Sequence, residues 1–195
     1  MEEGKAYQDH NNFSKDIKES EAIRTIITST INSNNFQAEF YFKYKFYKTV
    51  YDIIYAWVKK ENNINRLGIF ARQIVIENNN IIKVEFDTHV SSLITDKGII
   101  ELKISQENNL ERVKPIGVKI LDNTDIDNFI VNSDISMKYL RQLISLYCKK
   151  HAKNIGLSST YHIYDDYDTL FASGALEDGF IIAHWVNLCS KRKNN

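Results

Sequence analysis

The chain is poor in the two residues that most often build turns of special backbone geometry. Its 195 residues include one proline and seven glycines. Phosphate-binding loops need several glycines close together, and the sequence contains no such cluster. The nucleophile elbow G-x-S-x-G and the zinc-binding helix H-E-x-x-H are absent as well. These absences argue against nucleotide-binding folds and several hydrolase classes, and they leave open whether the chain is an enzyme.

Cysteines and long apolar runs are also scarce. The chain has two cysteines, and its N-terminal segment MEEGKAYQDHNN is polar. No apolar run approaches the roughly 18 residues that a membrane-spanning helix needs. Two cysteines without a signal peptide indicate reduced thiols. We therefore expect a cytoplasmic protein that does not enter a membrane.

An excess of charge of either sign is missing too, because 25 basic residues balance 25 acidic ones. This balance argues against a surface that is entirely a clamp for nucleic acid or membrane, although it is compatible with a local basic patch. The length suits one well-buried core. Residues 1–13 are polar and lack apolar periodicity. We expect a flexible arm over residues 1–15 and a single α+β domain over residues 16–195.

Two segments show helical spacing of apolar residues. Between Asp16 and Asn32 the isoleucines are spaced as on one helix face, and early carboxylates favour a helix N-terminus. The second helix is expected over Asp134–Lys153, with Ser133 or Asp134 as its N-cap. Its apolar stripe consists of Met137, Leu140, Ile144, Tyr147 and His151.

Strand patterns occupy the middle of the chain. Residues 73–77 and 81–87 are rich in β-forming residues on either side of Asn78-Asn79-Asn80, which predicts a hairpin. Residues 98–105 alternate, and residues 113–121 suit an edge strand with Pro115 near its start. The predicted fold is therefore α+β, with a small, mostly antiparallel sheet of about four strands packed against about three helices.

The stretch from Phe36 to Val58 concentrates aromatic residues and contains neither glycine nor proline. Read as a strand, it places Phe40 and Phe42 on one face and Tyr41 on the other. Read as a helix, its apolar residues recur at steps of four and three. The unbroken length favours a helix over residues 38–60 that forms the buried centre of the domain. The strand interpretation is the alternative, because aromatic residues prefer sheets.

Three residues could form a nuclease site: Asp87 at the end of one predicted strand, and Glu101 and Lys103 on the next. This pattern resembles the core of the PD-(D/E)xK nuclease superfamily. The resemblance implies that the two carboxylates hold Mg²⁺ and that the lysine activates water for phosphodiester cleavage. It covers residues 81–105, and Phe86 stands where the pattern has proline. The alternative is a solvated sheet face with cross-strand ion pairs.

Residues of metal-ligand type also occur. Cys148 and His151 lie one helical turn apart, and His184 and Cys189 form a second pair whose spacing does not suit chelation. We expect buried thiols and ordinary histidines here, and no metal site or cofactor; Mg²⁺ belongs to the nuclease alternative only. The acidic run that contains Asp165, Asp166 and Asp168 is expected to be a solvated loop that could contact a basic partner.

The aromatic stretch also carries lysines, namely Lys43, Lys45 and Lys48. With Tyr41 and Tyr47 exposed on a strand, it would resemble a stacking platform for single-stranded nucleic acid. If it is a helix, the rings belong to the core and the lysines border it.

The function expected from the sequence is the binding of another macromolecule, as in small immunity, inhibitor or adaptor proteins. The partner is expected to be another protein, with nucleic acid as the alternative. The expected contact residues are Asp165, Asp166, Asp168, Tyr41 and Tyr47, because tyrosine is enriched at interfaces.

Overall fold

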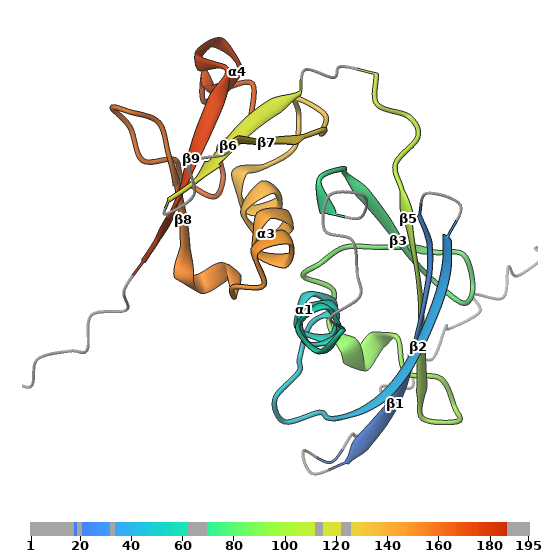
Figure 1. The fold of residues 1–195 in the computed structure, drawn as a ribbon. Helices are drawn as coiled ribbons and strands as arrows, with labels where there is room; N and C mark the ends of the chain where they lie inside the picture. The colour runs from blue at the N-terminus through green and yellow to red at the C-terminus, as the bar shows by residue number, and fades with distance from the viewer. Residues whose placement is uncertain are drawn as a thin grey trace, which may run out of the picture.

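The computed structural model describes residues 18, 21–31, 34–61, 70–111, 115–121 and 126–186. These residues form two sheets, of five and four strands, and Figure 1 shows helices α1 and α3 between them. The predicted arm over residues 1–15 lies outside the described residues. The prediction of a single domain over residues 16–195 stays a prediction.

The N-terminal unit contains the five-stranded sheet. Its elements in chain order are β1 (Ala22–Ile31), β2 (Asn34–Lys43), α1 (Val50–Lys60), β3 (Ile74–Asn78), β4 (Lys83–Val84), the 3-10 helix η1 (Val90–Ser92) and β5 (Ile99–Gln106). The strand order is β2-β1-β5-β3-β4, with β1 and β5 parallel and the other pairs antiparallel. This order leaves β2 at one edge of the sheet.

The C-terminal unit contains the four-stranded sheet. Its elements are β6 (Ile116–Ile120), β7 (Ile126–Phe129), α3 (Met137–Cys148), the 3-10 helix η2 (Ala152–Asn154), β8 (Ile155–Ser158), α4 (Ala175–Asp178) and β9 (Phe180–Trp185). The strand order is β7-β6-β9-β8, and β6 is parallel to β9.

The two units repeat one arrangement: a hairpin, a helix that begins after its second strand, and a last strand parallel to the first. The start of each helix is tied to a later loop in the same way. Val50 N–H donates to the Thr88 carbonyl at the start of α1, and Met137 N–H donates to the Asp168 carbonyl at the start of α3. The amino-acid sequence shows no internal repeat, so the equivalence lies in the topology.

Both helices begin at well-formed caps and join the two units. Thr49 caps α1 and forms a capping box with Asp52, and Ser136 caps α3. Ser136 thus takes the place of Ser133 or Asp134, the N-cap predicted from sequence for α3. Tyr51 on α1 hydrogen-bonds to Ser145 on α3. One cluster of buried apolar residues includes members of both sheets and both helices.

The α+β class predicted from the sequence is confirmed, but the single sheet of about four strands is wrong, because there are two sheets, of five and four strands. Most strand pairs are antiparallel, as expected, although each sheet also has one parallel pair. The expected hairpin around residues 78–80 is confirmed by β3 and β4. The helix predicted within Asp134–Lys153 is confirmed as α3, with Ser136 as its N-cap.

The helix expected between Asp16 and Asn32 is wrong, because residues 22–31 form strand β1. The helix expected over residues 38–60 is confirmed only in its second half, where α1 spans residues 50–60, because residues 38–43 belong to strand β2. The chain turns at residues 44–46, and α1 then begins at Val50. In β2 the strand preference of aromatic residues outweighs the helical spacing, because Phe40 and Phe42 can pack inward while Tyr41 faces water.

Candidate binding groove beside strand β2

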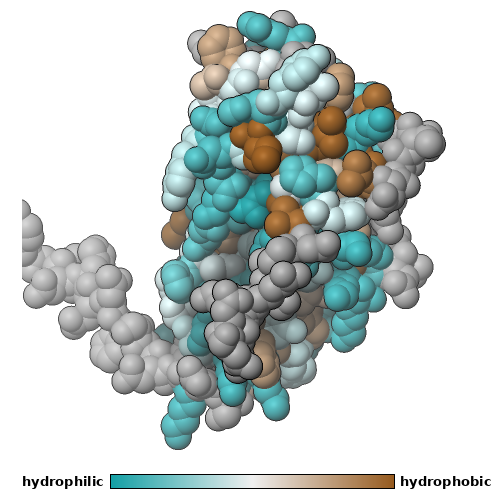
Figure 2. Space-filling view, turned by 90° about the vertical axis from the view of Figure 1, so that its left-hand side faces the viewer, coloured by the Kyte–Doolittle hydropathy of each residue, from teal (hydrophilic) through white to brown (hydrophobic). Residues whose placement is uncertain are grey.

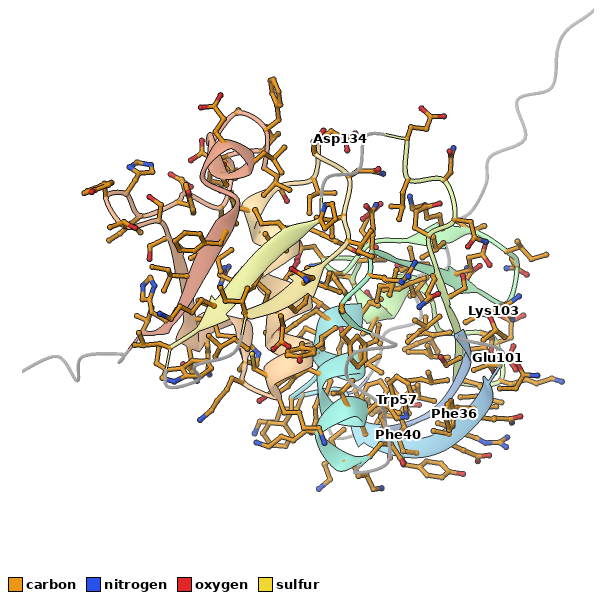
Figure 3. All side chains as sticks on the ribbon, turned by 45° about the horizontal axis from the view of Figure 1, so that its top comes forward. Phe36, Phe40, Trp57, Glu101, Lys103 and Asp134 are labelled. Atoms are coloured by element: carbon orange, nitrogen blue, oxygen red, sulfur yellow. The ribbon has the colours of Figure 1, made fainter. Side chains whose placement is uncertain are left out.

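A groove of about 450 Å³ lies between β2 and α1. Aromatic side chains from both elements line it, and Figure 3 shows Phe40 and Trp57 in this part of the molecule. Its lining residues are Phe40, Tyr41, Phe42, Tyr47, Tyr55, Ala56, Trp57, Lys59 and Lys60. The combination of aromatic walls and two lysines distinguishes this groove from an ordinary gap between a strand and a helix.

Local sequence rules position these side chains. In β2 every second side chain faces the core, so Phe42 is buried while its neighbour Tyr41 is 66% exposed. On α1 the buried positions include Ile53, Ile54 and Trp57, which recur at helical spacing. Lys59 and Lys60 lie in the last turn, where positive charge is favourable.

The backbone of β2 is open on the side away from β1. Tyr44 N–H donates to the Glu21 carbonyl on the β1 side at 3.2 Å. Because backbone groups alternate in direction along an antiparallel pair, the odd-numbered residues of β2 point outward. No described strand pairs with that edge, since β2 is the terminal strand in the sheet order. Among the described residues, the outward peptide groups from 35 to 41 have no backbone partner, and the Lys43 carbonyl accepts from the Phe46 N–H in the turn.

Trp57, which lines the groove, carries a buried hydrogen-bond donor. Trp57 is 3% exposed, and its Nε1 atom has no hydrogen-bond partner among the described residues. Buried indole N–H groups usually have a partner, because leaving a donor unpaired costs about 1–3 kcal/mol. The Trp57 N–H is therefore a buried donor whose partner is not among the described residues.

The charge around the groove is predominantly positive. Lys48 lies 3.7 Å from the centre of the Tyr44 ring, and Lys59 lies 5.9 Å from that of Tyr55. The carboxylate of Glu39 on β2 is bound by Arg24 of β1, and this hydrogen bond lowers the pKa of Glu39. Arg24 thus neutralises the acid on β2, and the groove lining contains two lysines and no carboxylate.

The residues of the predicted nuclease site do not meet. Asp87 lies in the loop after β4, where its carboxylate binds Lys138 at 2.8 Å and Gln142 at 3.2 Å, both on α3. Glu101 and Lys103 lie on β5 between buried neighbours, on the outer face of the five-stranded sheet (Figure 3). Lys103 is directly opposite Glu77 of β3. Asp87 thus faces helix α3, whereas Glu101 and Lys103 lie on the sheet face around β5.

The residues of metal-ligand type are likewise not assembled. No three His, Cys, Asp or Glu side chains within the part of the chain that the structure describes are placed to hold a metal ion. His151 packs edge-on against Tyr51 and Tyr55, and burial lowers its pKa. His184 lies over Gly156 in the neighbouring strand. Cys189 lies outside the described residues.

The acidic loop is held in place by its own carboxylates. Asp166 accepts two hydrogen bonds from Arg141, at 2.9 and 2.8 Å. Asp165 accepts from the Tyr167 N–H, and Asp168 accepts from the Asp165 N–H. All three aspartates therefore accept hydrogen bonds that hold the loop in place. Their predicted contact with a partner stays a prediction.

Of the tyrosines predicted to contact a partner, Tyr41 is exposed and Tyr47 is half-buried, with its ring edge against Phe42 at 5.4 Å. Both line the groove. Sequence reasoning missed Trp57, Lys59 and Lys60. The alternation of Tyr41 with Phe40 and Phe42 could have indicated a strand, followed by a helix that begins after residue 48. Trp57, Lys59 and Lys60 would then belong to a helix separate from the strand.

Exposed apolar side chains also occur on the C-terminal unit, among them Ile126 (53% exposed), Ile163 (72%) and Phe171 (73%). Figure 2 shows the side of the molecule that carries this unit, with apolar residues separated by hydrophilic ones. Only at β2 do we find an aromatic groove, lysines and a free strand edge together among the described residues.

Within the described ranges, no helix is both long and apolar enough to cross a membrane.

No protein-family model matches the sequence. No curated protein matches it either. Among solved structures, the chain is similar to the N-terminal ubiquitin-like domain in the 4931431F19Rik protein, determined in solution, with 20% sequence identity and a TM-score of 0.36. The similarity covers 43% of this chain and 84% of that domain. A likeness of this extent assigns neither an activity nor a partner.

Proposed function

We propose that the chain is a macromolecule-binding protein that holds an extended, acidic polypeptide segment along the edge of β2. The segment adds a strand to the five-stranded sheet and places alternate side chains in the groove between β2 and α1. Strand addition of this kind derives affinity from main-chain hydrogen bonds and specificity from pockets for alternate side chains. The observation that carries the proposal is the coincidence of an open strand edge with an aromatic groove.

Charge defines the chemistry of the partner. Lys59 and Lys60 line the groove, and Lys43 is exposed at the end of β2. The acid on β2, Glu39, is already paired with Arg24. Carboxylates flanking an apolar core of the bound segment would meet these lysines, so the surface favours an acidic segment over a basic one.

A polypeptide fits this surface better than single-stranded nucleic acid. Base stacking needs free ring faces, but Tyr55 is stacked on Tyr51 and the Tyr44 ring is covered by Lys48. The most exposed rings of the stretch are Tyr41 and Phe46, both 66% exposed. The free peptide groups of β2, in contrast, match what an added strand requires.

The test uses a fluorescein-labelled synthetic peptide with alternating valine and threonine at its centre and aspartates at both ends. Fluorescence polarisation with the full chain is expected to show saturable binding. The double variant Lys59→Glu/Lys60→Glu is expected to weaken binding about tenfold, because each exposed ion pair contributes up to about 1 kcal/mol. A peptide N-methylated at alternate residues is expected not to bind, since it cannot form the strand hydrogen bonds.

The matched control is Lys83→Glu/Lys103→Glu, which makes the same charge change on exposed residues of β4 and β5. It is expected to leave the affinity within about twofold. Equal losses in both variants would reduce the effect to net charge and contradict a site at the groove. Tight binding of a labelled oligothymidine, with no binding of the peptide, would replace this proposal by the nucleic-acid alternative.

A further inference from the structure

The chain already adds a strand to one of its own sheet edges. Residues 71–73 lie along the end of β7, the edge strand of the C-terminal unit. Ile130 N–H donates to the Ala71 carbonyl at 2.7 Å, and Gln73 N–H donates to the Ile130 carbonyl at 2.9 Å. Arg72 and Ile130 form a parallel bridge. An extended segment therefore completes this edge in parallel orientation.

The segment is fixed by an apolar anchor and by the helix of the unit that it joins. Phe70, at its start, is fully buried, and Ala71 is 6% exposed. At the other end, Ile74 N–H donates to the hydroxyl of Tyr139 on α3 at 3.0 Å. The segment thus combines three kinds of contact: backbone pairing with the edge strand, a large buried side chain and a contact with the neighbouring helix.

Strand β2 is the counterpart of β7 in the N-terminal unit. Phe42 pairs with Ile23 as Phe129 pairs with Ile116, and both phenylalanines are buried. Each phenylalanine also precedes the first helical residue, Val50 or Met137, by the same number of positions. Ile130, which follows Phe129, therefore corresponds to Lys43, which follows Phe42.

The counterpart edge is open among the described residues. The carbonyl of Lys43 accepts from Phe46 N–H in the turn at 3.0 Å and has a second lone pair for a partner strand. Further back along β2, Tyr41 points its peptide groups outward. In place of a covering segment such as 71–73, the groove with Phe40 and Trp57 lies beside this edge.

We infer that the partner segment runs parallel to β2 and inserts one large apolar side chain into the groove, as residues 70–73 do beside β7. This inference rests on the proposed function and specifies its geometry. One partner segment binds per chain, because residues 71–73 occupy the equivalent edge of the C-terminal unit. Burying a large apolar side chain contributes roughly 1.5–3 kcal/mol, so its replacement by alanine should weaken binding about tenfold or more.

The experiment uses the full ¹⁵N-labelled chain and the peptide described above, with its central valine replaced by phenylalanine. One sample carries a nitroxide at the N-terminus of the peptide and the other carries it at the C-terminus. For a parallel strand, the N-terminal label should broaden amide signals near Asn35 and the C-terminal label those near Lys43 and Tyr47. The two labelled peptides serve as matched controls for each other.

Each outcome has a separate meaning. The reverse pattern, with the C-terminal label near Asn35, would overturn the parallel orientation and leave strand addition at β2 intact. Broadening confined to the outer sheet face around Lys103, or absence of binding, would overturn the proposed function itself. An unchanged affinity after phenylalanine-to-alanine replacement in the peptide would overturn the apolar anchor.

Discussion

The hydroxyl of Tyr51 is expected to be a main link between α1 and α3, and its removal should be costly. The Ala152 N–H donates to this hydroxyl at 2.8 Å, and the hydroxyl lies 2.8 Å from the Ser145 Oγ. Ser145 Oγ donates to the Gln142 carbonyl at 2.5 Å. Tyr51 must therefore donate to Ser145, which makes a directed chain of three hydrogen bonds inside the core.

In Tyr51→Phe the ring stays and the hydroxyl is lost. Ala152 is 5% exposed, so its N–H becomes a buried donor without a partner, at a cost of about 1–3 kcal/mol. Loss of the bond to Ser145 adds about 1 kcal/mol. We expect the free energy of unfolding to fall by roughly 2–4 kcal/mol in urea titrations, with a Tm lower by roughly 5–15 °C.

The matched control is Tyr55→Phe. The Tyr55 hydroxyl makes a long hydrogen bond, 3.5 Å, to the Lys149 carbonyl in a less buried position. Its loss should change stability by less than about 0.5 kcal/mol. A cost below about 0.5 kcal/mol for Tyr51→Phe, or equal costs for the two variants, would refute the hydrogen-bonded chain.

Alkaline unfolding gives an independent test of the same site. Burial raises the pKa of Tyr51 to about 12 from an ordinary value of 10.0. Because the folded-state pKa is raised, this stabilisation is complete below pH 10 and is lost as the pH rises toward 12. The shift corresponds to about 3 kcal/mol. The difference in stability between the wild-type chain and Tyr51→Phe should therefore shrink over this pH interval.

Three further substitutions have distinct expected outcomes. Gly156→Ala would place a Cβ against the ring of His184 and should destabilise the chain by about 1–3 kcal/mol; the added change His184→Ala should recover most of this loss. Ile81 has a φ of 60° and is 78% exposed, so Ile81→Asn should gain about 1 kcal/mol, whereas Ile82→Asn, with no positive φ, should gain nothing. Burial lowers the pKa of His151 below its ordinary value of 6.5, so its contribution is present above pH 6.5 and lost as the pH falls; His151→Gln should flatten the acid side of the stability profile.

The elements that sequence reasoning predicted well depend on local information. The stripe from Met137 to Tyr147 repeats at helical spacing, and the asparagines at 78–80 suit a tight turn, so α3 and the β3–β4 hairpin could be predicted. Strand β1 could not, because its buried face alternates isoleucine with the polar residues Thr25 and Ser29. These polar residues hide the period of two, and the remaining isoleucines imitate a helix.

The candidate site was predicted only in part, for a related reason. Tyr41 and Tyr47 stand out by residue type, but the groove depends on how the last turn of α1 lies against β2. The sheet that α1 packs against also contains the parallel pairing of β1 with β5, which brings together Arg24 and Ile99 from distant parts of the chain. Neither a local pattern nor a short motif indicates such a pairing. A short motif can also mislead. The nuclease pattern predicted that Asp87 lies near Glu101, but Asp87 binds Lys138 of α3.

The strand-like pairing of residues 71–73 with β7 also determines how the chain can be divided. This segment precedes in the chain the edge that it covers. A fragment that starts at residue 115 would lack both this segment and the anchor Phe70. It would present the unpaired peptide groups of Ile130 to other copies, which favours edge-to-edge aggregation. Cutting the chain between β5 and β6 to isolate the C-terminal unit therefore removes the segment that protects the β7 edge of that unit.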